Sequence, residues 1–277
     1  MIYSRFHGRT GNQMFQYAAA RALALTRETK VVLDERLAIH RGERSITRIW
    51  DLPRTTAPMP PSKHDRKAAY YLWRYFGSSP KYVREKTLGF DPGFFDLPDD
   101  SYLHGYWQSE KYFGPHTDQI RTDFRFPEPV GRNAEVVEEI AASPSISLHV
   151  RRGDYVGLAA HGVCDQTYYD AALAALLPRI DKDPVIYVFS DEPDWARDNL
   201  SLPGKRVVID HNGEDADFED MRLMSLCQHN IIANSSFSWW GAWLNANPGK
   251  VVVAPKGWFA NPKLVNPDLL PEDWIRV

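Results

Sequence analysis

Apolar runs recur through the second half of the chain, separated by segments with helical patterns. The runs occupy residues 146–150, 185–189, 207–209, 231–233 and 251–254, and the helical patterns occupy 166–177, 193–199, 217–227 and 238–244. Runs that are apolar throughout are typical of strands buried on both faces, so this alternation predicts a parallel, doubly wound α/β sheet. Ligands of such sheets bind at the carboxyl ends of the strands, so the residues after each run are the candidates for function.

The first half begins with a second α/β pattern. Residues 2–6 alternate like a strand, a glycine turn spans 7–11, an alanine-rich helix covers 13–26, and a strand follows at 30–34. Residues 53–100 are rich in proline and aromatic side chains, and they predict an irregular insertion with one helix near 64–76. A length of 277 residues suits two domains that share a cleft, which we place at 1–142 and 143–277.

Composition excludes several classes of protein. With 43% hydrophobic and 25% charged residues the chain is globular, and a net charge of -3 argues against a dedicated nucleic-acid binder. Cys164 and Cys227 are too few for a disulfide framework and are expected to be reduced thiols. The start of the chain lacks the pattern of a secretory signal, and no apolar run is long enough to span a membrane. We therefore expect a cytoplasmic protein with at most peripheral membrane association.

Two arginines follow the run at 146–150, in the segment His149-Val150-Arg151-Arg152-Gly153-Asp154. Guanidinium groups are always charged and match phosphate oxygens, so Arg151 and Arg152 are candidates to hold a diphosphate. The alternative is that neighbouring acids neutralise this pair without any ligand.

The next two runs also end in polar residues. Ser190 and Asp191 follow the run at 185–189, where they either contact a ligand or cap the helix that starts at Pro193. Asn234, Ser235 and Ser236 follow the run at 231–233 and begin a helix, which is a favourable place for an anion. The tryptophans that come next, at 239 and 240, are expected to be core residues.

No metal centre or covalent nucleophile emerges from the spacing of residues. His40, His64, His116 and Cys164 lack metal-ligand spacing, and no serine lies in a nucleophile elbow. The acidic triplet at 215–217 spells Asp-Ala-Asp but leads into a helix, where acids already suit the helix dipole. Phosphate binding without a nucleophile fits transfer of a group from a nucleotide-activated donor, with no metal or other cofactor.

Five segments together resemble the alpha-1,2-fucosyltransferases of glycosyltransferase family 11. They cover residues 8–17, 104–113, 149–155, 189–192 and 234–240 in that order. The first segment departs from the family, because Arg9 and Thr10 replace a usual glycine and leucine, and Glu192 stands where a second aspartate is common. These departures concern the preference for the acceptor more than the identity of the donor.

The resemblance implies a GT-B fold, with two Rossmann-like lobes that face a central cleft. The lobe at 143–277 would bind GDP-fucose, and the lobe at 1–142 would receive a galactose-terminated glycan. Transfer would invert the anomeric centre without a metal. The residues that carry over to donor binding are His149, Arg151, Arg152, Ser190, Asp191, Asp220, Asn234, Ser235 and Ser236.

Three residues are expected to act in catalysis, namely Arg152, Asp154 and Asn12. Arg152 would stabilise the charge that develops on the leaving diphosphate. Asp154 would accept the proton of the acceptor or only orient the arginines, and a dissociative reaction would need little help from a base. Asn12, with Gln13, would face the cleft. Two alternatives stay open, a binding protein that has lost catalysis and a transferase that uses another nucleotide sugar.

Overall fold

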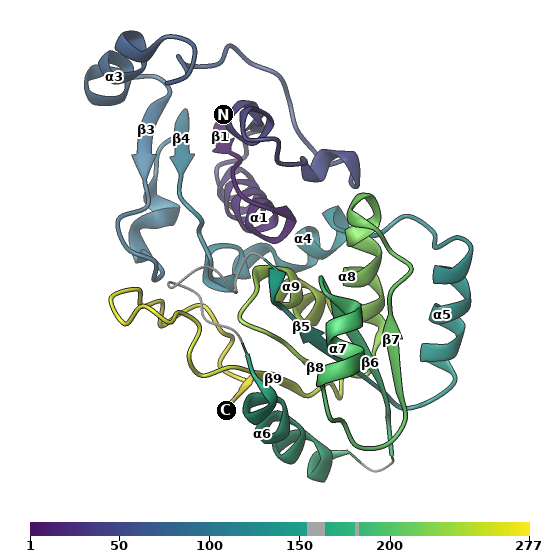
Figure 1. The fold of residues 1–277 in the computed structure, drawn as a ribbon. Helices are drawn as coiled ribbons and strands as arrows, with labels where there is room; N and C mark the ends of the chain where they lie inside the picture. Colours follow the sequence, from purple (N-terminus) through teal and green to yellow (C-terminus); the bar gives the residue numbers. More distant parts are fainter. Residues whose placement is uncertain (154–163, 181–182) are drawn as a thin grey trace. The chain divides into compact units, whose positions relative to one another are not determined.

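The computed structural model describes residues 1–153, 164–180 and 183–277 (Figure 1). The chain forms two compact units. Unit 1 comprises Met1–Pro127 and Val265–Pro271, and unit 2 comprises Glu128–Leu264 and Glu272–Val277. The division falls before the boundary expected at residue 142, because helix α5 (Arg132–Ala141) buries Val136 and Ile140 in the core of unit 2.

Unit 2 is built on a six-stranded sheet in which every neighbouring pair is parallel. Its order is β10-β9-β8-β5-β6-β7. The strands are β5 (Ser145–Val150), β6 (Val185–Ser190), β7 (Arg206–Ile209), β8 (His229–Ile231), β9 (Val252–Ala254) and β10 (Ile275–Arg276). The parallel sheet predicted from the apolar runs is therefore confirmed.

Helices cover both faces of this sheet. Alternate residues of β6 point to opposite faces: Ile186 and Val188 belong to one buried cluster, and Tyr187 and Phe189 belong to another. The first cluster includes residues of α6 (Gln166–Leu176) and α7 (Pro193–Asn199). The second includes residues of α5 and α8 (Asp217–Leu226), with Phe237 of α9 (Ser236–Leu244) packed against it. The unit is therefore doubly wound.

The predicted core tryptophans are confirmed. Trp239 and Trp240 are both fully buried in α9, and their rings meet edge to face at 5.1 Å. A large aromatic cluster thus anchors the helix whose first turn carries the serines at residues 235 and 236.

Unit 1 contains a smaller parallel sheet of order β2-β1-β4-β3 (Figure 1). Its strands are β1 (Ile2–Arg5), β2 (Val31–Asp34), β3 (Lys81–Arg84) and β4 (Ser101–His104). Helix α1 (Thr10–Thr26) packs against β1, and its five alanines are all fully buried, which lets the backbone approach the sheet closely. The remaining helices are α2 (Arg36–His40), α3 (Lys67–Phe76) and α4 (Thr117–Asp123).

The segment expected to be an irregular insertion is more ordered than predicted. Helix α3 falls within the expected range, but β3 also lies in this segment and joins the sheet as its edge strand. The prediction missed β3 because it has only four residues and a cation at each end, Lys81 and Arg84. Its place comes from pairing with β4, a contact that local sequence does not encode.

In the described part of the chain, no helix combines the length and the apolar character needed to cross a bilayer.

A packing test follows from Gly241 in α9. A Cβ atom added there would lie 2.9 Å from Cβ of Met224 in α8, and this near-backbone atom cannot move without shifting its helix. Alanine favours a helix by about 1 kcal/mol over glycine, but overpacking costs about 1–3 kcal/mol. We expect Gly241→Ala to lower the free energy of unfolding in urea, whereas Gly249→Ala, where the added atom meets open space, should be neutral. Equal stability of the two variants would contradict this packing.

Candidate functional site

The register between β5 and β6 brings the predicted arginines beside acids. In this parallel pair, His149 lies opposite Phe189 and Val150 opposite Ser190. The two chains leave the sheet together, so Arg151 and Arg152 emerge next to Asp191 and Glu192. This is the carboxyl edge where ligands of parallel sheets bind.

Each arginine pairs with one of these acids. Nη1 of Arg151 lies 3.1 Å from Oδ2 of Asp191, and Nε of Arg152 lies 3.1 Å from Oε2 of Glu192. Asp191 also accepts the backbone N–H of Arg152 at 3.0 Å. The arginine side chains are only 12% and 21% exposed. Neutralisation by neighbouring acids, the alternative to an anion site, is thus present in the structure.

An aromatic ring also contacts the face of the Arg152 guanidinium. Its central carbon lies 3.6 Å from the centroid of the Trp195 ring, a close cation–π contact. The ion pair with Glu192 engages Nε, so within the described residues the two Nη groups are the donors left to meet an anion. The side chain is therefore oriented before any ligand arrives.

Gly153 lets the backbone after Arg152 approach the carboxylate of Asp191. A Cβ atom at this position would lie 2.5 Å from Oδ2 of Asp191, inside contact distance. Asp154, the predicted base, lies outside the described residues.

His149 supplies a buried, neutral imidazole beneath the arginines. Burial, helped by the positive charge of Arg151, lowers the pKa of His149 to about 3. Its ring lies 5.9 Å from that of Phe237, and the side chain is nearly inaccessible. Among the described residues Nδ1 of His149 has no hydrogen-bond partner. A buried polar atom in that state fits a site completed by a ligand.

The third predicted segment lies at the end of the neighbouring strand β8. Ser235 caps α9, since its Oγ accepts the N–H of Phe237 at 3.3 Å, and Ser236 begins the helix. Asn234 is buried, and its amide donates to the carbonyl of Trp258 at 3.1 Å while accepting from the thiol of Cys164. Because β8 and β6 flank β5, all three predicted strand ends lie along one edge.

Ser190 has a local role. Its Oγ accepts the N–H of Glu192 at 3.0 Å, just before α7 begins at Pro193. This bond shapes the turn that carries Asp191, which pairs with Arg151. No side chain caps the start of α7, so the capping role expected of Ser190 or Asp191 is not observed.

Asp220 lies in a separate polar cluster at the start of α8. Its Oδ1 accepts from Nδ2 of Asn212 at 2.8 Å, and the amides of Asn212 and Asn133 bond to each other at 2.8 and 3.1 Å. His211 contacts Oδ1 of Asn133 at 2.9 Å. Burial raises the pKa of Asp220 to about 7, with Asp217 and Glu219 adding to the effect and the Asn212 bond opposing it. A ligand that donates hydrogen bonds would favour the ionised carboxylate.

No group of three or more histidine, cysteine, aspartate or glutamate side chains among the described residues is arranged to hold a metal ion. The triplet at 215–217 instead forms a short helical turn leading into α8, as its sequence indicated.

In unit 1 the glycine turn is joined to the segment at 104–113. Oδ1 of Asn12 accepts from Nε2 of Gln108 at 2.9 Å. Gln13 is fully buried and bridges three loop positions, since Nε2 donates to the carbonyls of Gly8 and Arg44 and Oε1 accepts the N–H of Ile46. Gln13 therefore stabilises the loops that surround the turn. Its side chain is buried among them, whereas we expected it to face the cleft.

A cavity of about 250 Å³ opens at the carboxyl edge of the sheet in unit 1. Residues that follow three adjacent strands line it, with His7 after β1, Glu85 after β3, and Gly105 and Tyr106 after β4. The ring of His7 lies 4.6 Å from that of Tyr106 and 5.6 Å from that of His104. Sequence analysis missed this site because it did not predict β3 or β4, although the rule for strand ends would have found it.

Glu85 is the acid of this cavity. Its carboxylate accepts the N–H groups of Tyr106 and Trp107 at 2.7 and 2.9 Å. Burial raises the pKa of Glu85 above its ordinary value, and these two bonds oppose the shift. A Cβ atom at Gly105 would lie 2.4 Å from Cβ of Glu85, so only glycine lets the strand end approach the acid.

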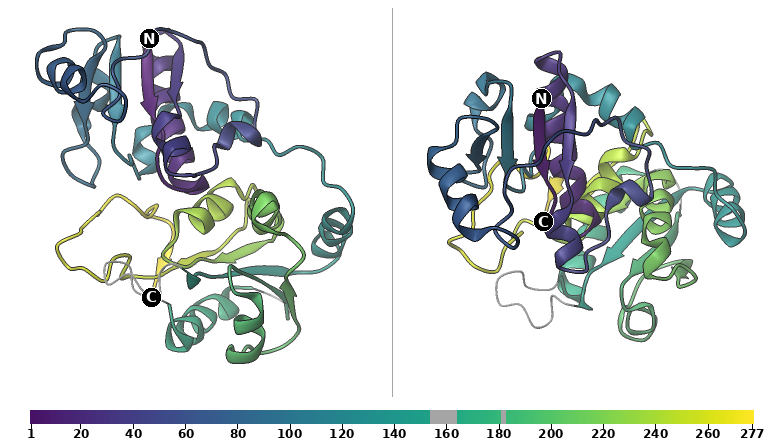
Figure 2. Two further views of the ribbon diagram at one scale, coloured as in Figure 1. Left: turned by 45° about the horizontal axis from the view of Figure 1, so that its top comes forward. Right: turned by 90° about the horizontal axis from the view of Figure 1, so that it is seen from above.

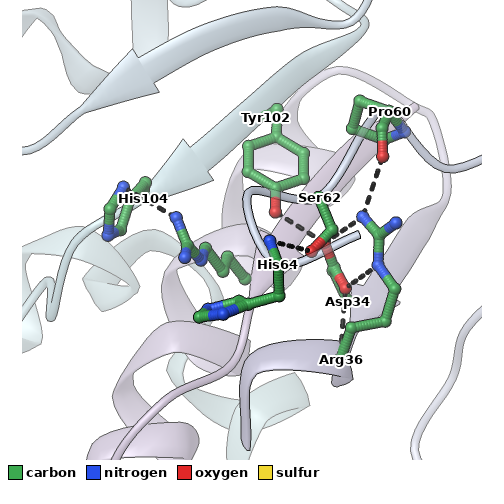
Figure 3. Close-up of polar contacts among 8 residues, drawn as sticks. Asp34, Arg36, Pro60, Ser62, His64, Tyr102 and His104 are labelled. Carbon is green, nitrogen blue, oxygen red and sulfur yellow. Dashed lines mark hydrogen bonds and ion pairs between the residues drawn. The ribbon is translucent and has the colours of Figure 1, made fainter. Parts of the chain in front are cut away.

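The histidines of this edge are neutral at pH 7. Burial lowers the pKa of His7 to about 4, and burial with the charge of Arg5 lowers that of His104 to about 3. Nδ1 of His104 (Figure 3) lies 3.3 Å from Nη1 of Arg5. The same nitrogen also contacts the hydroxyl of Tyr82. The cavity thus combines uncharged rings with one carboxylate, that of Glu85, and two cations, Arg84 and Lys86.

A buried ion pair fixes the neighbouring end of β2 (Figure 3). Asp34 accepts two bonds from Arg36, at 2.8 and 2.7 Å, and one from the hydroxyl of Tyr102 at 2.6 Å. Burial disfavours the charge, but these bonds outweigh it and hold the pKa of Asp34 below its usual value. Arg36 also donates to the carbonyl of Pro60 at 3.0 Å, which attaches the proline-rich segment to the sheet.

Comparisons with known proteins agree with this architecture. A model of Glycosyl transferase family 11 matches residues 1–277. An alpha-1,2-colitosyltransferase from Escherichia coli is 31% identical, with 100% of this chain and 99% of that protein aligned. Galactoside alpha-(1,2)-fucosyltransferase 1 from Bos taurus is 27% identical over 86% of this chain and 64% of its own length.

A solved structure supports the fold. NodZ alpha-1,6-fucosyltransferase, co-crystallized with GDP, superposes with a TM-score of 0.51 at 13% identity, covering 87% of this chain and 90% of that chain. This likeness concerns the fold alone and confirms the predicted GT-B-type α/β fold.

The buried imidazole of His149 predicts a pH-dependent stability. Its folded pKa of about 3 lies below the unfolded value near 6.5, so between these values the unfolded chain binds one more proton. The stability that this histidine contributes is therefore present above pH 6.5 and lost as the pH falls, by up to about 1.4 kcal/mol per pH unit. Urea unfolding from pH 7 to 4 should show a shallower loss in His149→Gln than in the unsubstituted protein. Parallel curves would contradict a neutral buried imidazole, and exposed His40→Gln serves as the control.

Proposed function

The chain belongs to glycosyl transferase family 11, and from this membership and the geometry of the site we propose the reaction that it catalyses. We propose that it transfers L-fucose from GDP-β-L-fucose to the 2-hydroxyl of a terminal galactoside, with inversion and without a metal ion. The observation that carries the proposal is the oriented arginine pair at the carboxyl end of β5, where a parallel sheet presents its ligand site.

The arginines supply the electrostatics of the proposed step. The acceptor hydroxyl attacks the anomeric carbon from the face opposite the diphosphate, so the carbon–oxygen bond to the diphosphate breaks as the new one forms. The leaving diphosphate gains negative charge, and Arg151 and Arg152 stabilise that charge more in the transition state than in the ground state. Their guanidinium donors would take the place of a divalent cation at the diphosphate, which is why we propose a metal-independent reaction.

The nucleoside would contact polar groups beside the arginines and the separate cluster that contains Asp220. His149 has a buried ring nitrogen that can take a hydrogen bond from the ribose or the base. The carboxylate of Asp220 suits guanine, which presents adjacent N–H donors on one edge. Ser235 and Ser236, at the start of α9, would add phosphate contacts, and Asn234 would fix the turn between them and the strand.

The acceptor sugar would bind in the cavity of unit 1. Tyr106 is 37% exposed beside His7, and an aromatic face of this kind can stack on the apolar face of a sugar ring. Glu85 can accept a bond from a sugar hydroxyl while it retains its two backbone bonds, because a carboxylate has about four acceptor positions. Asn12 would act near the acceptor from the adjoining turn, and Asp154 remains our proposed base.

GDP release tests the reaction and its donor. With a β-galactoside as acceptor, we expect GDP release from GDP-fucose and an alpha-1,2-linked product, and we expect UDP- and ADP-sugars to be inert. Because a relative is named a colitosyltransferase, GDP-colitose belongs in the same panel. Activity with GDP-colitose alone would refute fucose as the transferred sugar. GDP binding without any product would favour a binding protein that has lost catalysis.

Arg152→Ala in the same assay tests the role of the arginines. We expect turnover at saturating donor to fall by roughly 100-fold or more, by analogy with the loss of an oxyanion donor. The matched control is Arg132→Ala, because Arg132 is also ion-paired, to Glu135 and Glu139, but lies on the surface of α5. Near-normal turnover of Arg152→Ala would show that the ion pairs at this edge serve only the fold.

Tyr106 separates acceptor binding from donor binding. Removing the ring in Tyr106→Ala should raise KM for the acceptor by about tenfold, while KM for GDP-fucose stays unchanged. Tyr106→Phe keeps the ring and should behave like the unsubstituted enzyme. If both variants bind the acceptor normally, the cavity of unit 1 is not the acceptor site.

A further inference from the structure

Helix α3 has two apolar faces, and only one of them is used in the fold. On the inner face, Tyr70 and Trp73 are buried against the sheet. The Trp73 ring meets Tyr102 at 5.0 Å and Tyr82 at 5.4 Å, and its Nε1 donates to the carbonyl of Pro80 at 2.8 Å. These contacts fix how the helix is rotated on the sheet.

The outer face of α3 exposes large apolar side chains. Leu72 is 65% exposed, Tyr75 is 66% and Phe76 is 82%. With exposed Ala68 they follow a spacing of four, seven and eight residues, which forms one continuous stripe along a helix. Figures 1 and 2 agree in placing α3 at the outer edge of its unit, beside the edge strand β3. A clustered apolar stripe of this kind marks an interaction surface.

Lysine and arginine are abundant in the segment that carries this stripe. Residues 62–86 contain seven lysine or arginine residues and only two acids, in a chain whose net charge is -3. The cations Lys63, Arg66, Lys67, Lys81 and Arg84 are all exposed. Of the two acids, Glu85 faces the backbone amides of its cavity, which leaves only Asp65 exposed among these cations.

One further acid, Asp100, lies near the end of α3, and its charge is offset. Its Oδ1 pairs with the amino group of Met1 at 3.0 Å, and its Oδ2 accepts from the hydroxyl of Ser79 at 3.3 Å. The segment that carries the apolar stripe therefore has an excess of positive charge.

We propose that α3 binds the surface of an anionic phospholipid bilayer. The stripe at residues 68, 72, 75 and 76 would enter the boundary between headgroups and acyl chains, and the cations would contact lipid phosphates. Aromatic and leucine side chains beside lysine and arginine are the composition that such interfacial helices use. The charge favours a bilayer of anionic lipid over a second copy of this acidic chain. Because α3 has only ten residues, the binding is reversible and sensitive to salt.

Co-sedimentation of the full chain with vesicles tests this proposal. We expect the protein to sediment with phosphatidylglycerol vesicles at low salt, to be released as salt is added, and to stay in solution with phosphatidylcholine vesicles. Failure to bind phosphatidylglycerol, or equal binding to both lipids, would overturn the proposal.

Variants on the two sets of side chains identify the surface. Phe76→Ser should weaken binding by about tenfold or more, because a largely exposed ring is removed. Lys63→Glu and Lys67→Glu should each weaken it by at least about fivefold. Val130→Ser and Lys205→Glu, which change equally exposed residues of unit 2, are the matched controls and should bind as before.

Two further measurements separate membrane binding from unfolding of the variants and from dimerisation through α3. Each variant should keep the melting temperature of the unsubstituted protein, since none of the substituted side chains is buried. If α3 instead joined two copies of the chain, the protein would be dimeric without vesicles and Phe76→Ser would be monomeric. That outcome, or unchanged vesicle binding of all three variants, would refute binding through α3.

Discussion

The register between β5 and β6 is the constraint on which the candidate site depends. Pairing of Val150 with Ser190 makes Arg151 and Arg152 emerge beside Asp191 and Glu192. A slip of one residue would turn each side chain to the other face of the sheet and separate these charges. Because the acids and Trp195 hold the guanidiniums in place without a ligand, little side-chain freedom is left to lose when a diphosphate binds.

The two sheets present different chemistry at their carboxyl edges. Unit 2 presents two arginines, each paired with an acid, together with a neutral imidazole, and the guanidinium donors that the acids leave open suit a negatively charged ligand. Unit 1 presents Tyr106, His7, the carboxylate of Glu85 and the cations Arg84 and Lys86 around a small cavity, which suits a ligand rich in hydrogen-bonding groups. The same topological rule thus gathers arginines, acids and an imidazole at the strand ends of one unit and a small polar cavity at the strand ends of the other.

Sequence patterns predicted unit 2 well and unit 1 only in part. In unit 2 the apolar runs at 146–150 and 185–189 coincide with β5 and β6, so the residues after them, such as Arg151, could be identified. Strand β8 (His229–Ile231) begins two residues before the expected run, and β10 was not expected, because both contain polar or charged residues. In unit 1 the strand β3 is short and polar, and it becomes a strand only by pairing with β4. Glu85 and Tyr106 meet through that pairing, which local propensity does not encode. The sequence did not predict the partners of Asp220 either, since Asn133 and Asn212 approach it only through the packing of α5 against α8.

The cations near α3 require more than one explanation. Lys81 and Arg84 lie on β3, an edge strand, where charged side chains also prevent another strand from adding to the sheet. That reason does not extend to Lys63, Arg66 and Lys67, which lie on no strand. Nor does it account for Phe76, whose exposure gains nothing for the fold, since α3 is already attached through Trp73. A surface that binds both phosphate and hydrocarbon explains the cations and the apolar stripe together, and protection of the sheet edge explains only two of the cations.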